Sequence, residues 1–275
     1  MRVLHRCVLF DTKIWKTVAF IFLALVLSAA GRPQDPANPE SYPPDPSGDI
    51  SWTAGYIGVA DIQSHFNLAR SAENPALPPL VMPSQAEWNT KSNGEKALFL
   101  VNSERAVRGV PLLQGVESNV TTVAQNYANY LLANNLFTHC VSGSCPKDRL
   151  HAIPAIGACH DFIPYSENLA ALMTSASSLP LPLERAVYAW LYADGSCCSW
   201  GHRHALLHYP YADNSGTAGK EGFMGIGTAS GAYRGWPLGT VVVYNTFDPC
   251  STWGAPPQVS SDAKLVLSLL TRIIP

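Results

Sequence analysis

Histidine and acidic side chains that could form one site lie in four short patterns in the second half of the chain. The patterns are Phe137-Thr138-His139, Ser166-Glu167-Asn168-Leu169-Ala170, the segment from Trp190 to Asp194, and Gly201-His202-Arg203-His204-Ala205-Leu206-Leu207. Imidazoles and carboxylates that lie together can bind Zn²⁺, or they can form a hydrogen-bonded network that only braces a cleft. Each pattern alone is a weak signal, because a single histidine beside an apolar helix is more often a hydrogen-bonded structural residue.

Serine residues near these patterns raise the question of nucleophilic catalysis. Ser166 lies within one pattern, and Ser199 precedes His202 closely enough to suggest a Ser-His pair. The chain has no G-x-S-x-G motif and no other feature that would activate a serine. We therefore favour non-enzymatic binding over hydrolysis. His204 and His208 do not share a helical face with His202, so we expect them to be structural or exposed.

Capping signals and apolar periodicity predict the helices that position these residues. The expected helices cover residues 59–72, 92–108, 116–131 and 182–195. Ser92 and Glu95 have the spacing of a capping box, and Gly109 is suited to end the same helix. The helix over residues 116–131 is amphipathic, with Val116 and Tyr130 included on its apolar face.

Paired strands are predicted late in the chain. Residues 223–227 and 240–244 are rich in β-branched, aromatic and glycine residues, and residues 230–239 are a natural hairpin connection between them. Helices followed by paired strands indicate an α+β layered domain with an antiparallel sheet.

The order of compositional segments predicts an exported protein. Basic residues precede an apolar run at residues 17–27, and Ser28-Ala29-Ala30 follows as an acceptable cleavage site. This run is shorter than the ~20 residues that span a bilayer, so cleavage is favoured over an uncleaved anchor. The expected segments are a signal peptide at 1–30, a Pro-rich linker at 31–50, an N-terminal extension packing on the main domain at 51–90, that domain at 91–250, and a C-terminal tail at 251–275. The mature protein would be secreted or periplasmic, with no membrane span.

Composition bounds the size of the core and the kinds of partner. The chain has 275 residues, of which 47% are hydrophobic and 14% charged, which is enough for one sizeable core. Eighteen basic and twenty acidic side chains give a net charge of -2, so no general attraction to phosphate backbones exists. Nucleic acid is not an expected partner.

Cysteine usage agrees with export. The chain has seven cysteines, and Cys7 lies in the segment expected to be removed. The six that remain are Cys140, Cys145, Cys159, Cys197, Cys198 and Cys250. An even number in an oxidising compartment indicates disulfides, and the absence of a C-x2-C motif argues against a zinc cluster. We set aside a bridge between the adjacent Cys197 and Cys198 on geometric grounds, and the other pairings stay open.

Five motifs in order resemble the CAP superfamily (cysteine-rich secretory, antigen 5, pathogenesis-related 1; the SCP domain), particularly its bacterial branch. The motifs are residues 102–109 (NSERAVRG), similar to N-x-x-R-x-x-x-G; Phe137-Thr138-His139; Asp148-Arg149; Glu167 within SENLA, similar to G-E-N-L/I-A with Ser166 replacing glycine; and residues 199–203 (SWGHR), similar to S-P-G-H-R. The resemblance covers residues 95–250.

The resemblance implies a three-layer α-β-α sandwich with a central antiparallel sheet. Its cleft would gather His139, His202 and Glu167. The family's second glutamate falls at Ala193 in this chain, and Asp194 is one residue later. On a helix Asp194 lies about 40° from Trp190, so it is a fourth candidate for the cleft.

The function implied is that of an exported binding or interaction module whose His/Glu cleft binds a divalent metal, Zn²⁺, or is braced without one. One alternative is a lipid or sterol carrier, for which the apolar residues 168–182 could line a groove. A metal-dependent hydrolase or protease is less favoured. The expected partner is therefore an unknown protein or a small apolar ligand.

Overall fold

The fold combines helices with one four-stranded mixed sheet. The computed structural model describes residues 43–110, 112–157, 167–207 and 222–247. The strands are β1 (Gly115–Val116), β2 (Glu167–Thr174), β3 (Phe223–Tyr233) and β4 (Trp236–Phe247), in the order β1-β3-β4-β2. The helices are α1 (Val59–Glu73), α2 (Gln85–Thr90), α3 (Asn93–Ala106), α4 (Ser118–Ala133), α5 (Pro146–His151), α6 (Pro154–Gly157), α7 (Pro182–Tyr192), α8 (Gly195–Cys198) and α9 (Gly201–Leu207).

The sheet is antiparallel except at one edge. β4 pairs antiparallel with β3 and β2, whereas the two-residue β1 pairs parallel with β3. This corrects the expectation of a purely antiparallel sheet. The predicted strands are confirmed but are longer than expected, because the strands continue into residues 230–239 and turn only at Arg234 and Gly235. Both turn residues have positive φ, as a tight hairpin turn requires.

β2 was not predicted, because it is buried on both faces and shows no polar alternation. Leu169 and Met173 join the apolar core beside α4, and Leu172 joins the core on the other face. Residues 168–174, which were expected to line an apolar groove, are therefore core residues of the sheet. Since successive side chains of a strand point to opposite faces, Glu167 and Asn168 face opposite sides of the sheet.

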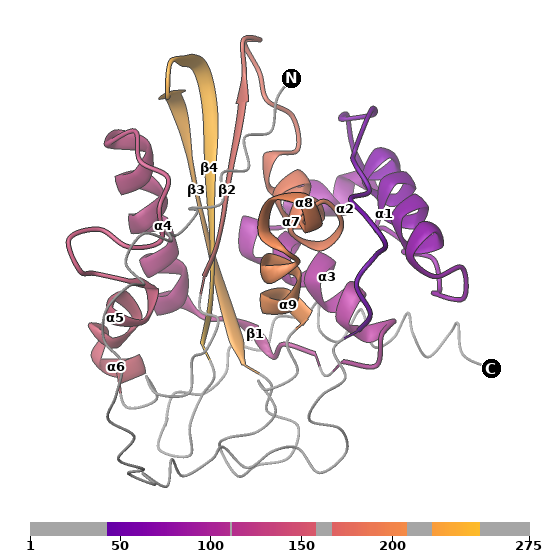
Figure 1. Cartoon of the computed structure of the whole chain (residues 1–275), viewed down its shortest axis with the longest axis horizontal. Helices are drawn as coiled ribbons and strands as arrows, with labels where there is room; N and C mark the ends of the chain where they lie inside the picture. The colour runs from indigo at the N-terminus through magenta and orange to yellow at the C-terminus, as the bar shows by residue number, and fades with distance from the viewer. Residues whose placement is uncertain (1–42, 111, 158–166, 208–221, 248–275) are drawn as a thin grey trace, which may run out of the picture.

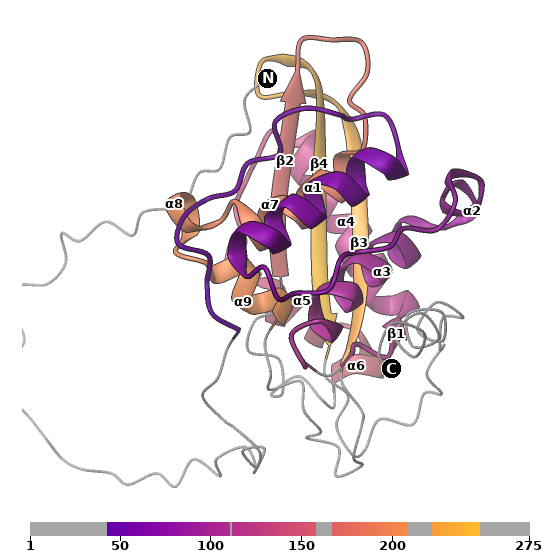
Figure 2. The ribbon, with the colours of Figure 1, turned by 90° about the vertical axis from the view of Figure 1, so that its right-hand side faces the viewer.

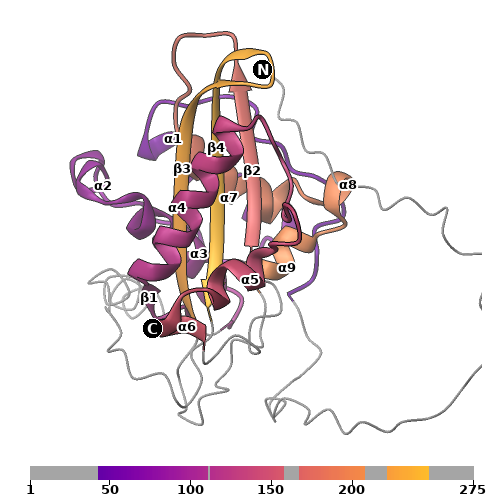
Figure 3. The ribbon, with the colours of Figure 1, turned by 90° about the vertical axis from the view of Figure 1, so that its left-hand side faces the viewer.

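Helix α4 covers one face of the sheet, as Figures 1 and 3 show. Its close approach depends on glycine: a Cβ at Gly225 or Gly227 would lie 2.2–2.3 Å from backbone atoms of α4. Two details of the predicted helix were wrong. Val116 belongs to β1, and Tyr130 is 41% exposed because it faces away from the buried stripe.

The other face is covered by α3, α7 and α9, with α1 outside them (Figures 1 and 2). The predicted capping box of α3 is confirmed, since the Ser92 hydroxyl accepts from Glu95 N and Glu95 accepts from Ser92 N. Helix α7 begins at the predicted Pro182 but ends at Tyr192, earlier than expected.

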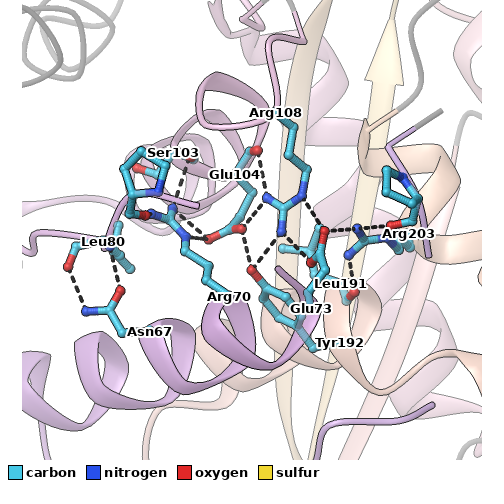
Figure 4. A network of polar contacts seen from close by, with 12 residues as sticks. Asn67, Arg70, Glu73, Leu80, Ser103, Glu104, Arg108, Leu191, Tyr192 and Arg203 are labelled. Carbon is cyan, nitrogen blue, oxygen red and sulfur yellow. Dashed lines mark hydrogen bonds and ion pairs between the residues drawn. The ribbon is translucent and has the colours of Figure 1, made fainter. Parts of the chain in front are cut away.

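Helix α1, which matches the predicted helix over residues 59–72, is joined to the domain by a buried ionic network (Figure 4). Arg70 of α1 binds Glu104 of α3, and Glu73 of α1 binds Arg108. Glu104 also accepts from Arg108 and from the Tyr192 hydroxyl of α7. Burial alone would raise the pKa of Glu104, but the charges of Arg70 and Arg108 and the Tyr192 hydrogen bond outweigh it and lower that pKa to about 2.

Residues 43–50, part of the predicted linker, have no helix or strand but contact the domain. The Asp49 carboxylate accepts from Gly195 N at the start of α8, and Asp45 contacts His204 of α9. The predicted signal peptide and the C-terminal tail lie outside the described residues. Within the described ranges, no helix combines the length and apolar character needed to cross a membrane.

Candidate functional site

Glu167, the first residue of β2, is the centre of one polar cluster. Its Oε1 lies 3.0 Å from Nδ1 of His139, and its Oε2 lies 2.5 Å from Nη2 of Arg149 and 3.3 Å from Nδ2 of Asn245. The Glu167 side chain is fully buried. A buried carboxylate needs such a set of donors, because leaving its charge unpaired would cost several kcal/mol. The predicted contact between His139 and Glu167 is therefore present.

His139 lies in the loop between α4 and α5, and the loop is closed by the Cys140–Cys145 disulfide. Arg149 of α5 donates to the His139 carbonyl at 3.0 Å, so one guanidinium holds both the histidine backbone and the glutamate. The imidazole is 44% exposed. The loop thus presents a ring that is anchored at Nδ1 and open on its other side.

Tyr127 of α4 packs against this cluster. The Arg149 guanidinium carbon lies 3.4 Å from the centre of the Tyr127 ring, and the Tyr127 hydroxyl donates to the Thr138 carbonyl. Burial raises the pKa of Tyr127 to about 12, although the charge of Arg149 opposes the change. Tyr127 is therefore a neutral hydrogen-bond donor and a cation-π partner at physiological pH.

Asp194 and His202 form a second pair. Nδ1 of His202 lies 2.6 Å from Oδ1 of Asp194, and the backbone N–H groups of His202 and Arg203 donate to Oδ2. Asp194 is fully buried and caps the first turn of α9. The His202 imidazole is 17% exposed.

Asp194 is part of the site, but the prediction that it shares a helical face with Trp190 was wrong. α7 ends at Tyr192, so Asp194 does not share a helical face with Trp190. It reaches His202 because the chain reverses after α8, where Ser199 and Trp200 both have positive φ.

The two pairs lie on either side of the first two residues of β2. Glu167 faces the side of α4 and α5, while Asn168 faces α9, where its Nδ2 donates to the His202 carbonyl at 3.0 Å. The structure thus brings His139 to Glu167 and His202 to Asp194. Among the described residues, the side chains that lie close enough together to share an ion include His202 but neither His139 nor Glu167.

A different group of metal-capable side chains is close-packed. Among the described residues, Asp194, Cys197, Cys198 and His202 each offer a ligand atom, and these atoms lie within 4.8 Å of one another. Two sulfurs, an imidazole nitrogen and a carboxylate oxygen fit the ligand preferences of Zn²⁺. All four residues were candidates from the sequence, Asp194 and His202 for the cleft and the two cysteines for disulfides, but their proximity was not predicted.

The cysteines form two close pairs. Cys140 pairs with Cys145, and Cys197 pairs with Cys198. The second pair corrects the exclusion of a vicinal bridge: in the helical turn of α8, neighbouring side chains are about 100° apart rather than on opposite sides as in a strand. Disulfides fit an oxidising compartment. Cys159 and Cys250 lie outside the described residues.

The role of Arg149 was missed at the sequence level. Asp148-Arg149 was noted as a motif, but nothing in it shows which carboxylate the arginine binds. The available signal is electrostatic: a glutamate at the start of an apolar strand requires a cation, and Arg149 is a basic residue close to His139 in sequence.

Comparisons with known proteins give little. No family model matches the chain, and no curated protein matches it. Among solved structures, the chain is similar to an outer surface protein from Borrelia burgdorferi, with 22% identity over 57% of this chain and 93% of that chain, and a TM-score of 0.33. A score this low does not establish a shared fold.

Proposed function

We propose that this chain is an exported, CAP-type binding module that is not an enzyme and has a three-layer α-β-α architecture. Helices against both faces of the sheet support this architecture. The motif residues that suggested the family resemblance also support it, since His139, Arg149 and Glu167 contact one another directly. The two disulfide pairs are consistent with export.

The observation that carries the proposal is that two imidazoles are each oriented by a buried carboxylate. His139 is held by Glu167 and His202 by Asp194, in both cases through Nδ1. Metal-binding histidines typically use one ring nitrogen for such an orienting contact and the other for the ligand. Nε2 of each ring has no hydrogen-bond partner among the described residues, so it is the atom offered to a ligand, with a divalent cation as the simplest candidate.

A binding role is favoured over catalysis because Glu167 is fully engaged. His139, Arg149 and Asn245 all bind its carboxylate, so it acts as an anchor rather than as an available general base. The lipid-carrier alternative relied on residues 168–182, and the strand part of that segment is buried in the sheet. No observation favours a second function.

Zn²⁺ titration of the oxidised mature chain tests the binding role. Because the two pairs are separate, we expect His139→Ala and His202→Ala each to remove the Zn²⁺ binding of its own pair in calorimetry, since each removes an oriented imidazole. His204→Ala is the matched control, since His204 is a partly exposed histidine of α9 that contacts Asp45 instead. Wild-type affinity in both variants, or no binding by the wild type, would refute the proposal.

Export is tested separately. Mass spectrometry of secreted or periplasmic material should find a mature N-terminus near Gly31, because the apolar run and small residues before it have the pattern of a cleaved signal peptide. Exported protein that retains peptides beginning at Met1 would contradict cleavage.

A further inference from the structure

We propose that Asp194, Cys197, Cys198 and His202 form a redox-controlled site for a thiophilic divalent cation. The site is closed while the two cysteines form a disulfide and opens when they are reduced to a dithiol. This goes beyond the proposed function, which uses the oxidised protein and the two imidazole–carboxylate pairs. Because Asp194 and His202 take part in both, the experiment below separates the two ideas through His139.

The four side chains already lie nearly where the ligands of a bound cation would lie. Their ligand atoms lie within 4.8 Å of one another, and Oδ1 of Asp194 lies 3.5 Å from Sγ of Cys197 and 2.6 Å from Nδ1 of His202. In a tetrahedral zinc site, sulfurs about 2.3 Å from the metal are about 3.8 Å apart. Breaking the S–S bond is therefore the principal change needed, together with opening of the contact between Asp194 and His202 so that both side chains can bind the cation.

The backbone around the group is already held in place. Asp194 accepts from His202 N through its carboxylate and from Cys198 N through its carbonyl. The Asp49 carboxylate accepts from Gly195 N at the start of α8. The turn that carries both cysteines is thus fixed at each end, so the ligands need little ordering when a cation binds.

The position of the bridge argues against a purely structural role. The Cys197–Cys198 bridge has a sequence separation of one, whereas Cys140–Cys145 has a separation of five and closes the loop that carries His139. Stabilisation by a disulfide grows with the length of the loop it closes. A bridge between neighbours restricts the unfolded chain very little, so its main chemical consequence is to withhold two thiol ligands.

The site is accessible to a reductant and to a cation, and the reduction that opens it is chemically balanced. Cys197, Cys198 and His202 are partly exposed, while Asp194 is buried. An external dithiol supplies two electrons and two protons: its own sulfurs join in a disulfide, the Cys197–Cys198 bond breaks, and two thiols form. A phosphine gives the same two thiols, because it is oxidised to the phosphine oxide with the oxygen and protons of one water molecule. The cation then replaces both thiol protons, which leave to solvent.

Anaerobic Co²⁺ titration of the full mature chain, with and without a phosphine reductant, tests the site. We expect the reduced protein to show a thiolate-to-Co²⁺ charge-transfer band, which Zn²⁺ removes by displacement, and the oxidised protein to show none. The double variant Cys197→Ser/Cys198→Ser should lose the band. The matched variant Cys140→Ser/Cys145→Ser should keep it, because that pair lies in the loop between α4 and α5 and not in α8.

Two results would overturn the proposal: a reduced wild-type protein without the band, or a band that survives in Cys197→Ser/Cys198→Ser. His139→Ala distinguishes this site from the proposed function. It should leave the charge-transfer band of the reduced protein unchanged while weakening Zn²⁺ binding by the oxidised protein. A band that depends on His139 would contradict the four-residue site.

Discussion

Replacing Glu104 by glutamine should destabilise the protein strongly at neutral pH. The carboxylate is fully buried and is shared by Arg70, Arg108 and the Tyr192 hydroxyl (Figure 4). A pKa of about 2 in place of 4.5 corresponds to about 3 kcal/mol of stabilisation. Removing one partner of a buried ion pair typically costs ~3–5 kcal/mol, which agrees with this value. We therefore expect Glu104→Gln to lower the free energy of unfolding by about 3–4 kcal/mol at pH 7.

The lowered pKa of Glu104 determines how its contribution to stability changes with pH. Because the folded-state pKa of Glu104 is lowered, its stabilisation is complete above the unfolded value near 4.5 and is lost as the pH falls toward 2. Urea unfolding followed by tryptophan fluorescence at several pH values should show the difference between wild type and Glu104→Gln shrinking in acid. Glu87→Gln, at an exposed glutamate of α2, is the control and should change stability by under about 0.5 kcal/mol. A difference at pH 7 no larger than the ~0.5 kcal/mol typical of surface substitutions, or a difference that grows in acid, would show that the Glu104 carboxylate does not stabilise the fold.

Three further substitutions test the packing around the site. Gly227→Ala places a Cβ 2.3 Å from the α4 backbone and should lower the free energy of unfolding in urea by about 3 kcal/mol. Gly231→Ala, in the same strand, is the control and should be tolerated, because its Cβ would meet only an ordinary contact. Equal stabilities of the two variants would contradict the close packing of β3 against α4. Cys140→Ser/Cys145→Ser should cost about 2 kcal/mol in the oxidised protein, and an unchanged thermal midpoint would argue against this bridge. Asp194→Ala removes the cap of α9 and should cost about 1–2 kcal/mol, and wild-type stability would show that the cap is dispensable.

The helices were the most predictable elements, because their signals are local. The capping box of Ser92 and Glu95 and the proline at Pro182 each place a helix start correctly. Strand β2 carries no comparable signal, since its apolar residues face two cores at once. Tyr130 was misplaced because periodicity alone does not show where the face covered by the sheet ends.

The candidate site was predictable as a set of residues but not as an arrangement. The order of the motifs carries the resemblance that places His139 and Glu167 in one cleft, and the contact between these two residues is present in the structure. The pairing of Asp194 with His202 depends on the chain reversal after α8, and the proximity of Cys197 and Cys198 to that pair depends on the same turn. Reversals of this kind arise from left-handed backbone at non-glycine residues, which sequence patterns do not reveal.

The most direct test of the binding module is the response of individual imidazoles to a cation. Long-range ¹H–¹⁵N spectra of the oxidised, ¹⁵N-labelled mature chain resolve both ring nitrogens of each histidine. On adding Zn²⁺, we predict that the Nε2 resonances of His139 and His202 shift while the ring resonances of His65, whose Nδ1 contacts the Asp61 carbonyl, stay in place. Unchanged Nε2 resonances for both His139 and His202 at saturating Zn²⁺ would contradict the account.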